Sequence, residues 1–600
     1  MRLTKTLLVL LFFLIITNAA AEEQITNVYQ REQISLNGNW KIIVDPYDNG
    51  YYTFHMAERK DGYFIDTVPA EGERGVEHKY TDDYTLAVPG DWNTQRDDLF
   101  FYEGSIWYRK DFDFTKPGDK RTFVYFGAAN YKAVVYLNGE KLGTHEGGFT
   151  PFNFEITDKI KDGSNYIVVK VDNYRQEDRV PTVMTDWWNY GGLTRDVFIF
   201  STPETFIEDY SIQLKKNSLN EVNGWVKLNG DYNNREVTVK IPELNVSVSG
   251  RANKEGIVNV NFKKDFELWS PEDPKLYDVE VSTTDDKISD KIGFRSVKTE
   301  GESILLNGKK VYLRGISIHE VAPFRPGRAY TKEDAETLLG WAKELGCNYV
   351  RLAHYPHNEF MVRKADEMGI LLWTEVPVYW AIDYENEATY QNAEQQITDM
   401  IKRDKNRASI ILWSLANETP VIDSRNKFLT KIAEKVRSID DTRLLTAALR
   451  LVYKDDILRI DDPLGEVLDV LGVNEYIGWY EGTPETPAKI KWVSDYNKPA
   501  VISEFGAGAL FGNHGDKDER WTEEFQVEVY KGQINMLNKV DFVVGMSPWI
   551  IKDFLSPRRP MYGIQDWYNR KGLISENGQR KKAFFTLQEF YKEKMNQETK

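Results

Sequence analysis

The chain has 600 residues, of which 41% are hydrophobic and 13% aromatic, so it is long enough for several hydrophobic cores. Its formal net charge of -16 argues against a nucleic-acid partner and provides no general attraction for an anionic ligand. Cys347 is the only cysteine, which excludes an internal disulfide, and with seven scattered histidines neither a metal nor a cofactor is expected.

The amino terminus is predicted to be a targeting segment. Arg2 and Lys5 precede an apolar run over residues 7–16, which is too short to cross a membrane. Small alanines then offer a cleavage site before Glu22, and no later apolar stretch is long enough to span a bilayer. We therefore expect residues 1–21 to be a cleaved signal peptide of a bacterial protein that is periplasmic or secreted, with no membrane span.

Residues 22–203 show short alternating strands separated by turns. Asn138 and Gly139 follow the apolar run 134–137 and precede another short run, which is the strongest short-range indication of a hairpin. A further strand is expected at residues 167–171. This pattern predicts a β-sandwich of the jelly-roll type.

Residues 204–294 contain a second, smaller set of expected strands. The segment has the size of an immunoglobulin-like β-sandwich but no cysteine, so the likeness is to the architecture alone. We expect a separate sandwich domain here.

From residue 295 to residue 600 the pattern changes to alternating strands and helices. Thr331 is a candidate helix cap with Asp334 three residues on, apolar residues then recur at helical spacing, and Gly346 ends the pattern. Eight strands are expected at residues 311–315, 348–352, 370–374, 409–414, 444–448, 467–473, 500–503 and 542–546. Eight strand–helix units in about 300 residues predict a (β/α)8 barrel.

Two apolar strands of this barrel each deliver a glutamate at the carboxyl end. Glu418 follows the fourth strand, next to Asn417, and Glu504 ends the seventh. A retaining glycosidase needs two such carboxyl groups, one to protonate the leaving oxygen and one to attack the anomeric carbon. Each glutamate alone is equally well explained as a solvated loop residue; the pair on one barrel face is much more specific.

Other polar and aromatic residues are expected on the same face. Arg351 can pair with a carboxylate and His354 can contact substrate, although a lone histidine is more often structural. The amide of Asn417 can hold a sugar hydroxyl, and a phenol at Tyr476 can hydrogen-bond the nucleophile. Trp549 is expected to pack beside the sugar.

Several segments resemble glycoside hydrolase family 2, which includes β-galactosidases, β-mannosidases and β-glucuronidases. They are residues 101–109, 293–295, 348–356 and the segment that ends in Asn417 and Glu418. The resemblance covers nearly the whole mature chain. It implies that Glu418 is the acid/base, that Glu504 is the nucleophile and that configuration is retained.

Within the family the sequence is most similar to β-glucuronidases. Asp186 begins a segment similar to one whose aspartate binds sugar hydroxyls, and Asn474 and Tyr476 lie in a loop similar to that after the sixth strand. Asn569 and Lys571 match the Asn-x-Lys motif that binds the uronic carboxylate in glucuronidases. The resemblance implies an exo-acting β-glucuronidase without a cofactor.

The sequence also departs from the glucuronidase pattern. Phe505 stands where tyrosine is common, and residues 556–566 do not match closely, which leaves recognition of the sugar 4-position open. The stretch from Glu375 to about residue 391 is short, which favours an open site and an oligosaccharide of a uronate-containing polysaccharide as substrate. The alternatives are a β-galacturonidase or β-galactosidase of the same family and, from another class, a carbohydrate-binding protein. A homo-oligomer also remains open.

Overall fold

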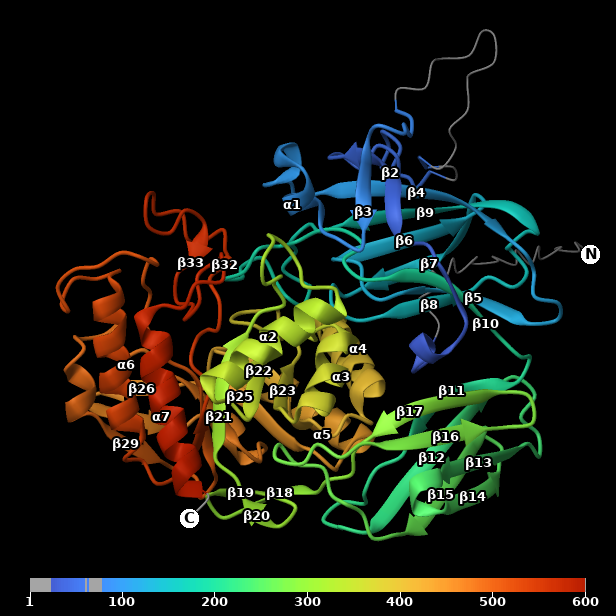
Figure 1. The fold of residues 1–600 in the computed structure, drawn as a ribbon. Coiled ribbons are helices and arrows are strands. Elements are labelled where there is room, and N and C mark those ends of the chain that lie inside the picture. The colour runs from blue at the N-terminus through green and yellow to red at the C-terminus, as the bar shows by residue number, and fades with distance from the viewer. Residues whose placement is uncertain (1–22, 60–61, 64–77, 599–600) are drawn as a thin grey trace, which may run out of the picture.

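The computed structural model describes residues 23–59, 62–63 and 78–598, which form two β-sandwiches and a barrel (Figure 1). The predicted signal peptide lies outside the described residues. Within the described ranges, no helix is both long and apolar enough to cross a membrane. The predicted multidomain class, a jelly-roll-type sandwich, an immunoglobulin-like sandwich and a (β/α)8 barrel, is confirmed.

The first sandwich packs a six-stranded sheet on a four-stranded sheet. The larger sheet has the order β3 (Thr85–Val88), β2 (Gly38–Asp45), β4 (Ser105–Phe114), β9 (Gly163–Asp172), β6 (Lys132–Leu137), β7 (Glu140–Glu146). The smaller has the order β1 (Gln33–Ser35), β10 (Val197–Thr202), β5 (Arg121–Phe126), β8 (Phe152–Glu155). Asn138 and Gly139 join β6 to β7 with φ of 51° and 87°, the left-handed turn that this dipeptide favours. The predicted hairpin is therefore confirmed.

The second sandwich has seven strands. One sheet has the order β11 (Phe206–Ser211), β12 (Glu221–Asn229), β15 (Ile257–Lys263). The other has the order β14 (Val246–Arg251), β13 (Glu236–Ile241), β16 (Tyr277–Ser282), β17 (Lys287–Ile292). The boundaries proposed from the sequence, after residues 203 and 294, fall between β10 and β11 and beyond β17.

Eight parallel strands close into a barrel, as predicted. They are β21 (Leu313–Ile318), β22 (Tyr349–Leu352), β23 (Leu371–Glu375), β24 (Ile410–Asn417), β25 (Leu444–Arg450), β28 (Leu471–Asn474), β30 (Ala500–Glu504) and β31 (Val543–Met546). The first strand starts later than predicted because Lys310 pairs with Leu305 in a separate small sheet. The sixth starts later than predicted because residues 467–470 form a turn and a bend that follow the 3-10 turn Pro463–Glu466.

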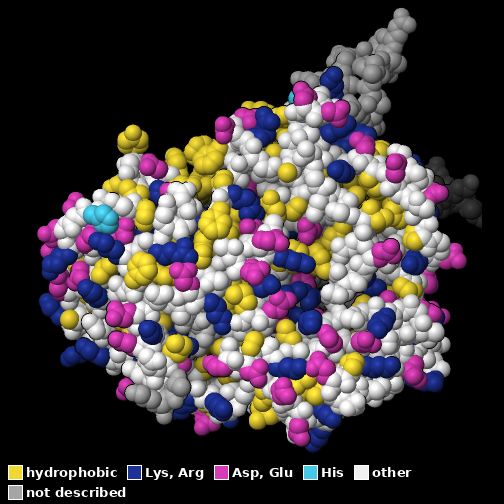
Figure 2. Space-filling model, viewed as in Figure 1, with side chains coloured by type: hydrophobic (Ala, Val, Ile, Leu, Met, Phe, Trp, Pro, Cys, Tyr) yellow, Lys and Arg dark blue, Asp and Glu magenta, His cyan; other side chains and the backbone are white. Residues whose placement is uncertain are grey.

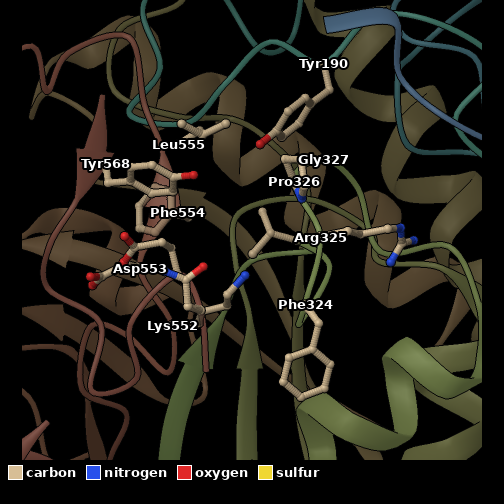
Figure 3. A pocket seen from close by; sticks show the side chains of 13 residues that line it. Tyr190, Phe324, Arg325, Pro326, Gly327, Lys552, Asp553, Phe554, Leu555 and Tyr568 are labelled. Carbon is tan, nitrogen blue, oxygen red and sulfur yellow. The ribbon is translucent and has the colours of Figure 1, made fainter. Parts of the chain in front are cut away.

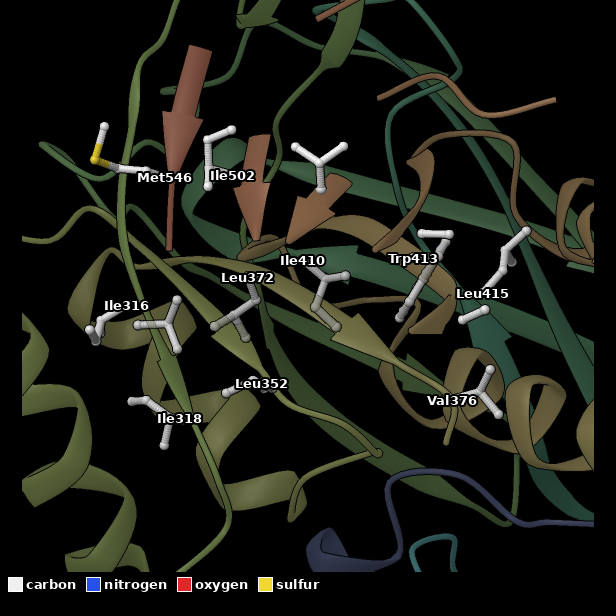
Figure 4. Close-up of a cluster of buried hydrophobic side chains, with 14 of the residues drawn as sticks. Ile316, Ile318, Leu352, Leu372, Val376, Ile410, Trp413, Leu415, Ile502 and Met546 are labelled. Atoms are coloured by element: carbon white, nitrogen blue, oxygen red, sulfur yellow. The ribbon is translucent and has the colours of Figure 1, made fainter. Parts of the chain in front are cut away.

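Helices and short sheets surround the barrel. The helices are α2 (Lys332–Leu345), α3 (Glu359–Met368), α4 (Glu387–Asp404), α5 (Asp423–Ile439), α6 (Glu523–Leu537) and α7 (Lys582–Glu598). After the fifth and sixth strands, a sheet of β26 (Val452–Lys454), β27 (Ile457–Ile460) and β29 (Lys491–Ser494) replaces the expected helices. Ile316, Leu372, Ile410, Ile502 and Met546 belong to the core cluster that links strands and helices (Figure 4). This packed scaffold holds the strand ends rigid.

A small sheet and the buried cysteine complete the barrel. The sheet consists of β18 (Val297–Glu300), β19 (Ser303–Leu306) and β20 (Lys309–Lys310). Its apolar residues, such as Ile304, pack against Leu313 and Leu371 at the amino ends of the strands. Cys347 is buried, as a small apolar residue would be, and burial raises the pKa of its thiol.

Helix α2 begins with the predicted capping box. The side chain of Thr331 accepts from the Asp334 backbone, and the Asp334 side chain accepts from the Thr331 backbone. Thr331→Ala should lower the free energy of unfolding by about 1 kcal/mol because one helix donor loses its partner. Urea-induced unfolding measures this, and Thr331→Ser, which keeps the hydroxyl, should stay near wild type. Equal losses in both variants would contradict the capping account.

The first sandwich lies against the carboxyl-terminal face of the barrel (Figure 1). The backbone N–H of Trp188, in the loop between β9 and β10, donates to the Leu555 carbonyl of the barrel at 3.1 Å. Arg195 donates to the buried carboxylate of Glu320 at 3.0 Å, and Arg328 donates to the same carboxylate. On the face in Figure 2, charges of both signs are interspersed rather than gathered by sign. The sandwich loop is thus fixed over the barrel mouth.

Candidate active site

Most of the predicted site residues lie at the carboxyl ends of barrel strands. Residues at or just beyond these ends are His354, Asn417, Glu418, Asn474, Tyr476, Glu504 and Trp549. Asn569 and Lys571 come from β33 (Tyr568–Asn569) and the residues after it, and Asp186 comes from the sandwich loop. Carboxyl ends of parallel strands meet on one face, so residues far apart in sequence converge here.

Glu504 is held by two donors. Its Oε1 accepts from Arg351 Nη1 at 2.8 Å, and its Oε2 accepts from the Tyr476 hydroxyl at 2.8 Å. These hydrogen bonds, one of them from a charged guanidinium, fix the orientation of the Glu504 carboxylate. The position of the Tyr476 phenol agrees with the prediction that it bonds the nucleophile. Glu504 is thus an anchored anion at the end of β30.

Arg351 is fully buried and connects three strand ends. Besides Glu504, its Nη2 donates to the Asn417 Oδ1 at 2.8 Å and to the Glu375 carboxylate at 3.1 Å. His354 Nδ1 lies 2.9 Å from Glu375 Oε1. Burial opposes ionisation of Glu375, but Arg351 and His354 together hold its pKa below the usual value. The network fixes the Arg351 guanidinium, which donates to Glu504 and to Asn417 at the same time.

Glu418 has the environment of an acid. It is partly buried after β24, and its Oε2 accepts from Trp380 Nε1 at 2.9 Å. Burial raises its pKa, the negative charge of Glu504 raises it further, and the hydrogen bond from Trp380 opposes both effects. Glu504 is thus held in place by two donors, whereas the environment of Glu418 suits a group that carries a proton.

Asn417 has an unused donor in the site. Its Oδ1 accepts from Arg351 and, at 3.2 Å, from Asn474 Nδ2, which leaves its own amide nitrogen buried without a partner among the described residues. Ser503 donates to Asn474 Oδ1 at 2.7 Å and fixes that amide. A buried, unpaired N–H is costly unless a ligand accepts from it. Asn417 is therefore oriented to donate to a ligand.

The Trp549 ring stacks on the His354 ring, with centroids 4.8 Å apart and planes inclined by 21°. His354 Nε2 lies 3.8 Å from Glu504 Oε1. The rings of His319 and Trp187 also contact His354. Both predicted residues thus lie beside the anchored carboxylate in an aromatic layer.

Asp186 reaches the barrel from the sandwich but its carboxylate is already occupied. Oδ1 accepts from the Ser556 hydroxyl at 2.6 Å and from Arg559 Nε at 3.1 Å. Oδ2 accepts from Arg559 Nη2 and, at 3.2 Å, from Asn569 Nδ2. The prediction that Asp186 binds sugar hydroxyls directly stays a prediction; its observed contacts orient Arg559 and Asn569.

Lys571 is a buried cation without a counter-charge. It is 4% exposed, and Nζ donates to the Tyr480 hydroxyl at 2.7 Å. Nζ also lies 5.3 Å, 5.8 Å and 4.8 Å from the ring centroids of Tyr476, Trp479 and Tyr480. In the described part of the chain it forms no ion pair with a carboxylate. Burial raises the pKa of the Tyr480 hydroxyl, but the positive charges of Lys571 and Arg559 outweigh this effect and lower the pKa below its usual value.

A hollow connects this cation with its neighbours. Its lining includes Trp479, Tyr480, Arg559, Asn569 and Lys571. An uncompensated buried ammonium is costly unless an anion binds to it. The hollow can therefore receive a small anionic group.

Sequence reasoning missed Trp380, Arg558 and Arg559. Trp380 lies in a loop after β23 and has no motif of its own. The two arginines fall in the segment recognised only as a departure from the usual pattern, and adjacent basic residues in a loop are usually solvated. Only their contacts distinguish them from ordinary loop residues. Trp380 contacts Glu418, Arg558 lies over Trp380, and Arg559 contacts Asp186.

A second hollow lies beside the site, between Tyr190, Arg325, Lys552 and Tyr568 (Figure 3). Burial lowers the pKa of Lys552 to about 8, and its Nζ donates to the Ala322 carbonyl at 2.7 Å. Arg325 is paired with Asp334. The cations of this hollow thus have partners within the chain. Among the described residues, no group of three or more His, Cys, Asp or Glu is arranged to hold a metal.

Three family models match the chain. They describe the sugar binding domain of glycosyl hydrolases family 2 at residues 34–203, glycosyl hydrolases family 2 at residues 205–295, and the TIM barrel domain of that family at residues 297–596. Together these matches extend over nearly all of the described residues.

Two relatives and one solved structure are similar to this chain over most of its length. The chain is 28% identical to a β-glucuronidase of Paenibacillus borealis, over 92% of this chain and 96% of that protein. A relative from Formosa agariphila is longer: it is 28% identical over 84% of this chain but only 66% of its own length. The crystal structure of a Ruminococcus gnavus β-glucuronidase is 26% identical, with a TM-score of 0.80 over 95% of this chain and 99% of that one.

Proposed function

The chain belongs to glycosyl hydrolases family 2 and is a glycoside hydrolase, and on that premise we propose that it is an exported, retaining exo-β-glucuronidase. It would remove terminal β-linked glucuronic acid from oligosaccharides of a uronate-containing polysaccharide. The β-glucuronidase names of its relatives support the glycosidic bond and the sugar.

The observation that carries the choice of sugar is the buried ammonium of Lys571. Its only polar partner among the described residues is the Tyr480 hydroxyl, so a negative charge in the hollow would be strongly stabilised. The C6 carboxylate of glucuronic acid supplies that charge, and Asn569 can donate to it as well. A neutral sugar such as galactose would leave the ammonium unpaired, which penalises its binding.

The first chemical step joins the sugar to the enzyme. The Glu504 carboxylate attacks the anomeric carbon, the bond from that carbon to the leaving oxygen breaks, and Glu418 transfers its proton to the oxygen. Arg351 and Tyr476 hold Glu504 in position. The amide of Asn417 donates to the sugar 2-hydroxyl, a contact that strengthens as the oxocarbenium-like transition state forms.

The second step releases the sugar. Glu418, now ionised, removes a proton from water, whose oxygen attacks the anomeric carbon while the ester bond to Glu504 breaks. Two displacements return the β configuration. The pKa of Glu418 is raised chiefly by burial and then by the negative charge of Glu504, which suits a group that must alternate between acid and base.

The rim of the site favours an extended substrate over a small conjugate. Phe101, whose ring contacts those of Trp188 and Trp567, is 63% exposed, and the loop from Glu375 to the start of α4 is short. Apolar faces at an open mouth can stack on further sugar rings. The proposal of export comes from the amino-terminal pattern of the sequence.

The test is release of 4-nitrophenol from the β-glucuronide, β-galacturonide and β-galactoside. Turnover of the glucuronide in clear preference to the others is expected. Preference for the galacturonide would still agree with Lys571 as the partner of the carboxylate. It would show that the site binds an axial rather than an equatorial 4-hydroxyl. Preference for the galactoside would overturn the carboxylate argument. Binding of a sugar without hydrolysis of any glycoside, including oligosaccharides, would favour a carbohydrate-binding protein.

Trp380→Phe should move the basic limb of the pH profile of kcat/KM to higher pH. Glu418 must carry its proton in the first step, so activity falls as pH rises through its pKa. The Trp380 N–H stabilises the ionised form and lowers that pKa, and its removal therefore raises the pKa. The profile is measured with 4-nitrophenyl β-glucuronide.

A control replaces a tryptophan outside the site. Trp492→Phe changes a partly buried ring of β29, which packs on the outside of the barrel core. Its profile should match wild type. A basic limb that stays in place in Trp380→Phe, or moves equally in both variants, would contradict the role of Trp380.

A further inference from the structure

The part of the site that would receive the leaving group has no role assigned so far. Glu418 protonates the leaving oxygen, so the leaving group must lie close to the Glu418 carboxyl. A partly exposed side chain that contacts this carboxyl therefore borders the leaving group. That side chain is Trp380, whose Nε1 lies 2.9 Å from Glu418 Oε2 and whose ring is partly exposed. The indole therefore marks the subsite on the far side of the cleaved bond.

Arg558 lies over this indole. Its Cζ is 4.8 Å from the Trp380 ring centroid, and its Nη1 is 3.9 Å from the Met184 sulfur. Arg558 is exposed, and within the described ranges its guanidinium pairs with no carboxylate. A thioether is a weak acceptor, so most of the five N–H donors remain free for a ligand.

The neighbouring arginine points to the opposite side of the site. Arg559 forms two hydrogen bonds with Asp186, beside Asn569. Ser556 fixes the segment, because its backbone N–H donates to the Trp567 carbonyl at 2.7 Å and its hydroxyl donates to Asp186. The segment fixed by Ser556 thus places Arg559 near the sugar that is released and Arg558 near the leaving group.

We propose that Arg558 and Trp380 form the subsite adjacent to the cleaved bond, and that this subsite takes a sugar bearing a carboxylate or a sulfate. The proposal rests on the proposed function and extends it from the terminal sugar to the one before it. The planar guanidinium matches the oxygen pairs of either anion.

The charge balance of the protein supports an anionic partner for Arg558. The net charge of -16 provides no general attraction for an anion, so a positive charge that binds one must be local, as Arg558 is. When a sugar covers the Trp380 ring it excludes water from the guanidinium, which strengthens an ion pair made there. Met184, which is 53% exposed, borders the same space with an apolar surface.

The test compares three synthetic disaccharides in which glucuronic acid is β-linked to a second sugar. The second sugar is neutral in the first, carries one sulfate in the second, and carries a carboxylate in the third. Wild type should show a higher kcat/KM for at least one charged disaccharide than for the neutral one. Arg558→Gln should reduce that preference about tenfold.

Two further variants isolate the charge. Arg558→Lys should keep a substantial part of the preference because it retains the cation. Arg235→Gln changes a partly exposed arginine that pairs with Asp285 in the second sandwich, and it should behave as wild type. Raising the salt concentration should weaken the preference in wild type and have little effect in Arg558→Gln.

The outcomes separate this inference from the proposed function. Cleavage of all three disaccharides with no preference for charge, or an equal preference in wild type and Arg558→Gln, would overturn the subsite while leaving the glucuronidase intact. Failure to cleave any glucuronide, aryl or disaccharide, would overturn both. A preference for the sulfated over the carboxylated disaccharide, or the reverse, identifies which anion the subsite reads.

Discussion

Glu504→Gln should lower kcat on 4-nitrophenyl β-glucuronide by on the order of 10⁴-fold or more while the fold stays intact. The amide has no negative charge with which to attack the anomeric carbon, yet it has the size and shape of the carboxyl. Its amide oxygen can still accept from Arg351, and its amide nitrogen can donate to the Tyr476 hydroxyl, which donates to Glu504 in the wild type. Single-turnover kinetics measures the loss, and circular dichroism checks the fold.

A matched control replaces another buried glutamate close to the same face. Glu475 directly follows β28, and burial raises its pKa to about 8, so it is largely uncharged at neutral pH. Glu475→Gln should therefore change kcat little. Full activity in Glu504→Gln, or an equal loss in both variants, would remove the nucleophile assignment.

Azide rescue separates the two catalytic carboxyls by stereochemistry. In Glu504→Ala, azide can replace the nucleophile in a single displacement, so the product should be the α-glucuronosyl azide. In Glu418→Ala, azide can attack only the glycosyl-enzyme, and two displacements should give the β product. Exchanged products would exchange the two roles.

Lys571→Ala should reduce kcat/KM for the glucuronide by on the order of 10²–10³-fold, because the buried carboxylate loses its counter-charge. The loss should be far smaller for a β-galactoside or a β-glucoside. The glucoside differs from the glucuronide only at C6, so the ratio of the two losses isolates the carboxylate.

Lys571→Met tests whether charge or volume is responsible. It removes the ammonium but keeps most of the side chain within the ring cluster of Tyr476, Trp479 and Tyr480. The same selective loss is expected. Equal losses on the glucuronide and the neutral glycosides, in either variant, would show that Lys571 supports the fold of the site rather than reading the substrate.

The architecture could be predicted from local patterns in the sequence. The apolar runs that became β24 and β30 are buried along their whole length, and such runs favour the interior strands of a parallel barrel. The Asn138–Gly139 turn and the Thr331 cap were equally readable, because their hydrogen bonds and backbone angles involve only near neighbours. The expected helices after the fifth and sixth strands were not found, since short amphipathic segments are ambiguous.

In the candidate site, too, some features follow from local sequence patterns and others depend on contacts between distant residues. By itself the sequence determined the barrel, the two strand-end glutamates and the Asn569 and Lys571 pair, because each depends on local pattern or motif. Only the tertiary structure decided that Arg559 pairs with Asp186, 373 residues away, and that Trp380 contacts Glu418 beneath Arg558. A charged or aromatic loop residue has the same local pattern whether it faces solvent or a ligand, and its partner is set by the packing of one domain on another.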